Sequence, residues 1–326
     1  MSKLVYVLPV ISGLLLLTNS IAWAGHDDDD GYSRGVCSST AYTLIRACKY
    51  DAKDDYWLGK AKCLNVTDHK ERWECFVDNY ADMLEANEEC RDVLDARLEL
   101  CDEIGEAAYD PDFDPENFVD PRDIGDNVVP NPYFPLVAGN TWVYEGDGET
   151  ITVTVTDKTK LIDGVTCVTV NDVAEEDGVV VENTDDWYAQ DLEGNVWYCG
   201  EIAQNFELFD GDDPEEPELV DVDGSFKAGR DEAKGGILIK AVPEVGDILR
   251  QEFALGDAED IAKVLSVNAN ETSPVASCNG ACLQTLEYTP LEPGHFEHKY
   301  YVPGVGLILE VDMEGNRVEL VEFTSP

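Results

Sequence analysis

The sequence predicts an α+β protein of two domains. The first is a disulfide-stapled antiparallel α-hairpin, and the second is an antiparallel β barrel, half-barrel or sandwich. Two observations predict this fold class. Six cysteines near the N-terminus are spaced symmetrically, and residues 131–323 are a succession of β-branched and aromatic runs separated by Gly, Asp, Asn and Pro. Because strands do not alternate with helices, the pattern favours an antiparallel sheet.

The first six cysteines predict a ladder of three disulfides. Their intervals along the chain are 11, 15, 12, 15 and 11 residues, which read the same in both directions. Intervals of about three and four helical turns keep the cysteines of each arm on one helix face. Facing Cα atoms of two packed helices come close enough for disulfides. Nested pairing is symmetric about position 69 and predicts Cys37–Cys101, Cys48–Cys90 and Cys63–Cys75.

The sequence also predicts where the turn between the two arms lies. Leu64 to Thr67 is a plausible turn, and Asp68 with Glu71 has the spacing of a capping box, with Asp in the cap position. We therefore expect residues 25–109 to form a six-cysteine α-helical hairpin.

An acidic, proline-rich segment follows at residues 110–130 and predicts an extended linker that packs little. Its acids alternate as in a calcium loop, but Pro115 and Pro121 stand where an EF-hand needs glycine and glutamate. A loose calcium site and a solvated segment therefore both stay open. The acidic insertion at 207–223 leaves the same two alternatives. The candidate Ca²⁺ ligands are Asp110, Asp112, Asp114, Glu116, Asp210 and Asp212.

Residues 131–326 predict the antiparallel β domain. Two aromatic pairs, Trp187-Tyr188 and Trp197-Tyr198, flank a short loop and are expected to face each other across a hairpin. Cys167 and Cys199 lie within predicted strands and are expected to bridge neighbouring strands. The remaining pair, Cys278 and Cys282, is expected to close a small loop.

The N-terminus predicts export. Lys3 precedes an apolar stretch, and Ala22-Trp23-Ala24 supplies a small-residue cleavage site, so residues 1–24 read as a signal peptide. An even count of ten cysteines, all after that segment, favours disulfides. The expected localisation is secreted or periplasmic, with no membrane span in the mature chain.

The charge narrows the classes of partner. With 69 acidic and 22 basic residues, the chain has a formal net charge of −47, and removal of residues 1–24 makes it more negative. Such a surface repels phosphate backbones and anionic lipids, which disfavours nucleic-acid or membrane-surface binding. It suits cations, or a basic or apolar ligand or protein partner.

Two segments carry a resemblance. Asn131-Pro132-Tyr133-Phe134-Pro135-Leu136, followed by Gly139, Trp142 and Tyr144, resembles the start of the C-terminal antiparallel β domain in uncharacterised exported bacterial proteins. The run from Tyr300 to Leu307, YYVPGVGL, resembles their final hairpin. Some of those proteins distantly resemble half-barrel lipoprotein carriers. The resemblance implies a barrel or half-barrel and no activity, and the lipid-anchor cysteine of the carriers is missing here.

The sequence therefore predicts a secreted, acidic, non-enzymatic binding or interaction protein of unknown ligand. One alternative is a secreted hydrolase that uses paired carboxylates in the β domain. A second alternative is a structural component of the cell surface or matrix. No cofactor is implied other than possible Ca²⁺, and the sequence singles out no catalytic residue.

Overall fold

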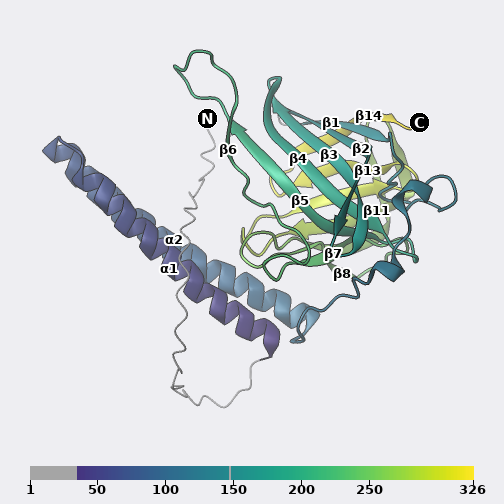
Figure 1. The fold of residues 1–326 in the computed structure, drawn as a ribbon, viewed down its shortest axis with the longest axis horizontal. Coiled ribbons are helices and arrows are strands. Elements are labelled where there is room, and N and C mark those ends of the chain that lie inside the picture. The colour runs from purple at the N-terminus through teal and green to yellow at the C-terminus, as the bar shows by residue number, and fades with distance from the viewer. Residues whose placement is uncertain (1–34, 147) are drawn as a thin grey trace. The chain divides into compact units, whose positions relative to one another are not determined.

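Two long helices precede an antiparallel sheet in the computed structural model, which describes residues 35–146 and 148–326 (Figure 1). The signal peptide expected at residues 1–24 lies outside the described residues. The helices are α1 (Val36–Leu64) and α2 (His69–Ile104), followed by two short 3₁₀ turns, η1 (Pro115–Asn117) and η2 (Pro121–Asp123). The strands are β1 (Thr141–Gly146), β2 (Glu149–Ile162), β3 (Val165–Glu176), β4 (Val179–Gln190), β5 (Val196–Glu207), β6 (Glu218–Asp221), β7 (Lys234–Ile239), β8 (Ile248–Arg250), β9 (Glu252–Phe253), β10 (Ile261–Thr272), β11 (Ser277–Tyr288), β12 (Glu297–Val302), β13 (Gly306–Asp312) and β14 (Arg317–Thr324).

The helices form the predicted disulfide-stapled hairpin. The three disulfides are Cys37–Cys101, Cys48–Cys90 and Cys63–Cys75, and their Cα–Cα distances are 5.7, 5.8 and 5.6 Å. This near-constant separation is what two side-by-side helices provide. The nested pairing and the symmetry of the cysteine intervals thus have one cause, which is the antiparallel course of the two helices.

Side chains cap both helix N-termini. Asp68 accepts hydrogen bonds from the backbone N–H groups of Lys70 and Glu71, at 2.8 and 3.0 Å, as its spacing predicts. Glu106, which follows α2, reaches back to the start of α1 and accepts from the backbone N–H and the hydroxyl of Ser38. These hydrogen bonds lower the pKa of the Glu106 carboxyl. The start of α1 and the segment after α2 are therefore joined by hydrogen bonds at the end of the hairpin opposite its turn.

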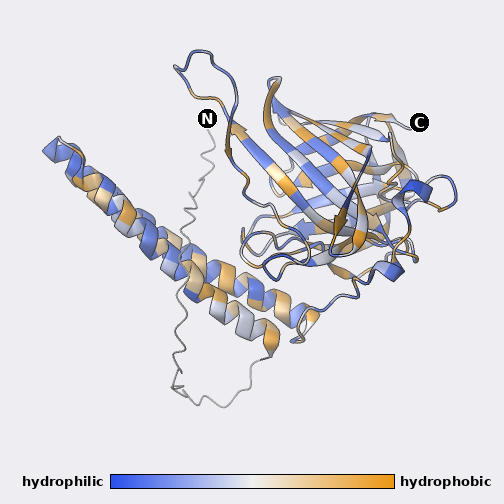
Figure 2. Cartoon of the chain, viewed as in Figure 1, coloured by the Kyte–Doolittle hydropathy of each residue, from blue (hydrophilic) through white to orange (hydrophobic). Residues whose placement is uncertain are grey.

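Apolar packing contributes little to the hairpin. The buried residues of α1 are Ala41, Ala52 and Cys63, and those of α2 are Cys90, Arg97, Leu100 and Cys101. Figure 2 shows hydrophobic residues scattered among hydrophilic ones along both helices. No helix of the described residues is long and apolar enough to span a bilayer. The disulfides, more than a core, hold α1 against α2.

The strands of the described residues form one antiparallel sheet that curls into a nearly closed barrel. Its order is β8-β10-β11-β12-β13-β14-β1-β2-β3-β4-β5-β7-β9, with β6 added beside β5. β8 pairs with β10 and β9 pairs with β7, and only Gln251 separates β8 from β9. The two ends of the sheet therefore meet in one short segment. Gly236 is needed there, because a Cβ atom at this position would lie 2.1 Å from the Gln251 carbonyl oxygen.

The two segments that carry the sequence resemblance contact each other. Trp142 donates its indole N–H to the Val305 carbonyl oxygen at 2.7 Å. The Gly304 N–H donates to the Pro132 carbonyl oxygen, also at 2.7 Å. Tyr144 donates its hydroxyl to the Leu307 carbonyl oxygen at 3.2 Å. Together these contacts fix the start of the β domain against the turn between β12 and β13 and against the start of β13.

The segment 110–130 packs against the β domain more than its composition predicts. The rings of Phe113 and Phe118 contact each other and the ring of Trp197, with centroid distances of 5.1 to 5.7 Å. The backbone N–H of Val119 donates to the Gln190 carbonyl oxygen at 3.0 Å. Prolines and acids alone predict an extended solvated chain, whereas these two phenylalanines cover an apolar patch on the outer side of the sheet.

A buried ion pair joins α2 to the β domain. Arg97 donates to both carboxylate oxygens of Glu259, at 3.0 and 2.5 Å, and both side chains are buried. Lys263 of β10 also pairs with Glu103 of α2 at 2.7 Å. A bidentate, desolvated arginine–carboxylate pair has a fixed geometry that exposed pairs lack.

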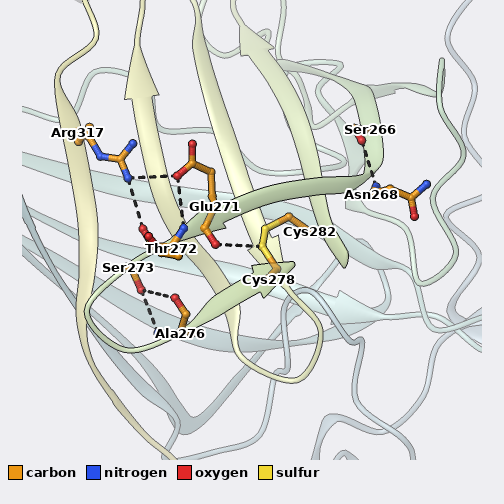
Figure 3. The surroundings of a disulfide bond; sticks show 9 residues. All are labelled: Ser266, Asn268, Glu271, Thr272, Ser273, Ala276, Cys278, Cys282 and Arg317. Atoms are coloured by element: carbon orange, nitrogen blue, oxygen red, sulfur yellow. Dashed lines mark hydrogen bonds and ion pairs between the residues drawn. A yellow bond between two sulfur atoms is a disulfide. The ribbon is translucent and has the colours of Figure 1, made fainter. Parts of the chain in front are cut away.

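The other two disulfides lie within the sheet. The Cys167–Cys199 bond joins β3 to β5 and passes over β4. The expectation that it would connect neighbouring strands was therefore wrong. Cys199 is the extra residue of a β-bulge, because the pairing moves from Trp187↔Gly200 to Tyr188↔Tyr198. Cys278 and Cys282 close a small loop within β11, as expected, beside the turn that joins β10 to β11 (Figure 3).

The acidic insertion 207–223 is only partly a loop. Its residues Glu218–Asp221 form β6, which pairs antiparallel with the end of β5. Asn205 donates its side-chain amide to Asp221 at 2.6 Å. Charge density therefore misleads at this position, because a strand can pair its backbone with the end of β5 while its Glu218 side chain stays exposed.

We expect the helical hairpin to depend on its disulfides. Replacing all six hairpin cysteines by alanine should lower the temperature at which the helical circular dichroism signal is lost, because each disulfide contributes about 2–4 kcal/mol. The matched control is the Cys278→Ala/Cys282→Ala variant, which should keep the helical transition of the parent protein. An unchanged helical melt in the six-cysteine variant would contradict this dependence.

Candidate functional site

A cavity of about 620 Å³ lies inside the β barrel. Most of its charged lining is acidic. The acidic lining residues are Asp172, Glu182, Asp186, Glu201, Asp223, Glu252, Asp257, Asp260, Glu287 and Glu292. Among the described residues that line it, Lys299 is the one cation. Tyr188, Tyr198 and Leu238 add ring and aliphatic surface to the same wall.

Strand alternation places the acids inside. In a curled sheet every second residue of a strand faces the interior. On β3, Val168 and Val170 belong to the apolar core, and Asp172, two residues further on, lines the cavity. On β11, Leu283 belongs to the core and Glu287 lines the cavity. The interior is therefore apolar along one part of these strands and carboxylate-lined along the next.

Lys299 is surrounded by carboxylates. Its ammonium group lies 3.2 Å from Glu287, 2.9 Å from Glu297 and 3.4 Å from Glu310. Burial by itself would lower the pKa of Lys299, but these three glutamates raise it well above its ordinary value. Burial raises the pKa of Glu310 to about 7, although Lys299 acts in the opposite direction. The single charge of Lys299 thus attracts all three glutamates but cannot neutralise all of them.

Asp186 and Glu201 form a carboxyl pair around one tyrosine. The Tyr198 hydroxyl contacts a carboxylate oxygen of Asp186 and lies 2.8 Å from one of Glu201. Burial, and then the charge of Glu201, raise the pKa of Asp186 well above its ordinary value. Burial raises the pKa of Glu201 to about 7, against the effect of the Tyr198 hydrogen bond. The pair therefore retains a proton near neutral pH.

Three further carboxyls lack a cation within ion-pair distance. Burial raises the pKa of Asp172 to about 7, and that of Asp260 to about 6. Burial, and then the charge of Asp260, raise the pKa of Glu252 well above its ordinary value. No Lys, Arg or His of the described part of the chain lies within 4.0 Å of their carboxylate oxygens. The cavity as a whole therefore has an excess of negative charge that protons or a bound cation would neutralise.

The structure does not gather the predicted calcium ligands. Asp110 forms an ion pair with Lys234 at 3.2 Å, and Asp114 caps η1 by accepting from the Glu116 N–H at 3.0 Å. Asp210 and Asp212 lie in the exposed loop between β5 and β6. Within residues 35–146 and 148–326, no three His, Cys, Asp or Glu side chains are arranged to hold a metal ion. Calcium binding by these residues stays a prediction.

The cavity carboxyls were not singled out from the sequence. A usable signal exists, since Asp172, Asp186 and Glu287 occupy the same alternation phase as buried apolar neighbours on their strands. An acid in that phase is unusual, because buried charges are costly. Recognising it requires knowing which phase faces the interior, and the sequence left that open.

No protein-family model, curated protein or solved structure matches this chain. The resemblance of the two terminal motifs of the β domain to exported bacterial proteins therefore stays an expectation from the sequence.

We expect the protein to be more stable at pH 5.5 than at pH 8. The pKa values of Asp172, Glu201 and Glu310 rise to about 7 on folding, so the folded state binds more protons than the unfolded state between pH 4 and pH 7. The stabilisation that these three carboxyls contribute is therefore present at low pH and is lost as pH rises through about 7. Thermal melts should show a melting temperature that is several degrees higher at pH 5.5, with about 2–4 °C for each kcal/mol.

A neutral isostere should remove part of this pH dependence. Asp172→Asn should raise the melting temperature at pH 8 and change it little at pH 5.5, because only the ionised aspartate is destabilising. Asp157→Asn, on an exposed position of β2, is the matched control and should leave both values unchanged. A lower melting temperature of Asp172→Asn at pH 8 would contradict the prediction that the ionised Asp172 carboxylate destabilises the folded state.

Proposed function

We propose that the protein is an exported, non-enzymatic binding protein whose β barrel takes up a small organic cation with more than one amine. The observation that carries the proposal is the excess of carboxyl groups over cations on the wall of the barrel cavity. The disulfides and the signal-like N-terminus support export to an oxidising compartment.

Size and composition favour an organic cation. A volume of about 620 Å³ lies within the range of about 300–1,000 Å³ typical of small-molecule sites. The carboxyls come from several strands and are distributed around the wall, so they can meet amines at several points of one ligand. Leu238, Ala203 and Ala258 offer contacts to methylene groups between the amines.

The tyrosines support the same chemistry. Tyr188 and Tyr198 line the cavity and are stacked, with ring centroids 4.5 Å apart. An aromatic face attracts an ammonium group by about 0.5–2 kcal/mol, more when water is excluded. The wall therefore combines carboxylates with aromatic rings, which together suit a protonated amine better than a neutral or anionic ligand.

Binding should be coupled to proton release. Because a cation favours ionised carboxyls, uptake displaces the protons that burial retains on Asp186 and Glu201. Affinity should therefore fall as pH drops from 8 to 5.5. In an oxidising extracellular medium this coupling would let acidification release the ligand.

We expect spermidine to stabilise the protein at pH 8. A concentration 100-fold above Kd adds about 2.7 kcal/mol, which corresponds to a rise of roughly 5–10 °C in Tm. Calorimetry in buffers of different ionisation enthalpy should show proton release. Butane-1,4-diol, a neutral chain, should have no effect. If spermidine at pH 8 neither shifts Tm nor gives binding heat, the proposal is wrong.

Removal of cavity carboxyls tests the site itself. Glu201→Gln/Glu252→Gln should weaken spermidine binding by roughly tenfold or more, because each charge-assisted contact is worth about 1.5–3 kcal/mol. The control, Glu215→Gln/Glu216→Gln, removes the same charge from the exposed loop between β5 and β6. Equal weakening in both variants would indicate a diffuse field and no cavity site.

The Asp186–Glu201 pair supports a second candidate, a hydrolase. One carboxyl that keeps a proton beside another that can ionise is the arrangement of an acid and a base. In this proposal Asp186 donates the proton and Glu201 acts as base. Product release from a panel of oligosaccharides, abolished by Asp186→Asn, is the result expected of a hydrolase. No turnover by the parent protein would exclude glycoside hydrolysis for that panel.

A further inference from the structure

The helical hairpin carries an exposed apolar face, which shares no residue with the lining of the barrel cavity. On α2, Trp73, Val77, Tyr80 and Leu84 are spaced four, three and four residues apart, which places them along one side of the helix. All four are exposed, with 65% of Trp73 accessible to solvent. The disulfide-bearing side of α2 contains Cys75, so this second side is not the seam with α1.

A matching row lies on α1. Tyr50, Trp57 and Leu64 repeat every seven residues, and 70%, 55% and 65% of their surfaces are exposed. The Tyr56 and Tyr80 rings contact each other at 6.5 Å, which joins the two helices on that side. Seven-residue repeats of large apolar side chains are typical of helices that pack against other helices.

Lysines accompany the aromatic residues of α1. The Lys60 ammonium group lies 4.8 Å from the ring centroid of Trp57 and 5.6 Å from that of Tyr56. Lys53 is four residues before Trp57 and therefore lies on the same side of the helix. The surface that α1 adds to the apolar face is consequently basic as well as aromatic.

The two helices have opposite net charges. Five basic and three acidic residues give α1 a net charge of +2, whereas four basic and twelve acidic residues give α2 a net charge of −8. In a chain of net charge −47, a positive helix is unexpected. Its natural complement is an acidic helix with an exposed apolar row, and α2 is one.

We propose that the hairpin is a self-association surface, on which a second copy of this chain docks. A twofold axis that runs parallel to the helices, between two hairpins stacked face to face, places α1 of each copy over α2 of the other. The two hairpins then form a four-helix bundle, in which the apolar rows are buried and each basic helix lies against an acidic one. The hairpin by itself buries few residues, so the bundle supplies the apolar core that it lacks.

Sedimentation velocity on the full mature chain tests this proposal. At about 0.15 M NaCl the charges of distant parts of the molecule are screened, and we expect a monomer–dimer equilibrium in the micromolar range. Trp73→Ser/Leu84→Ser should weaken dimerisation by roughly tenfold or more, with unchanged helical circular dichroism. Leu161→Ser/Val242→Ser, which removes two exposed apolar side chains of the β domain, is the control and should dimerise like the parent protein.

Isotope mixing identifies the surfaces that meet. Equal amounts of ¹⁴N- and ¹⁵N-labelled protein, treated with a zero-length cross-linker, should give mixed-isotope links between Lys53 or Lys60 and carboxylates of α2. A parent protein that remains monomeric at all concentrations would overturn the proposal. A dimer that is unaffected by Trp73→Ser/Leu84→Ser, or that lacks mixed-isotope links between the hairpins, would also overturn it.

Discussion

Closure of the sheet is the constraint on which the rest of the β domain depends. Once β8 and β9 join the two ends of the sheet, every strand has one side that faces the enclosed interior. Alternation then determines which side chains lose contact with solvent. Apolar residues such as Leu309 and Leu320 fill one part of that interior, and carboxyls fill the next. The core and the cavity are two consequences of the same geometry.

Enclosing so many carboxyls is unfavourable unless something compensates their charge. Lys299 forms ion pairs with Glu287 on the cavity wall and with Glu297 and Glu310 beside it, Tyr301 donates its hydroxyl to Glu287, and Tyr198 donates to the Asp186–Glu201 pair. Burial raises the pKa values of several cavity carboxyls towards neutrality, so protonation offsets part of the remaining charge. This costly, carboxyl-rich interior is the feature on which the proposed binding of a cation rests.

The hairpin solves a different problem. A pair of helices with a seam of alanines and cysteines has too little apolar area to be stable alone. Disulfides substitute for that area, and the bidentate Arg97–Glu259 pair ties α2 to the β domain. Because the disulfides hold the helices, the outer faces are free to carry Trp57 and Trp73. The disulfides thus allow large aromatic side chains to stay on the exposed side of the helices, because the seam between α1 and α2 does not need them.

Local chemistry and spacing in the sequence determined much of this protein. The symmetric cysteine intervals led to the nested disulfides, Asp68 to the cap of α2, and the β-branched runs to antiparallel strands. Each of these depends on residues whose partners are set by position along the chain. The expected facing of the two aromatic pairs succeeded only for Tyr188 and Tyr198. In the antiparallel register that pairs these two tyrosines, Trp197 lies opposite Ala189, and a one-residue bulge places Trp187 opposite Gly200.

Only the tertiary structure decided the cavity. With 69 acids in the chain, composition could not select Asp186 from β4 and Glu252 from β9 as members of one wall. Those two meet because the sheet closes, which is a long-range event with no signature at either residue. The packing of Phe113 and Phe118 on Trp197 is of the same kind. Spacing along the chain predicts local partners, whereas burial of a charge depends on which strands the closed sheet brings together.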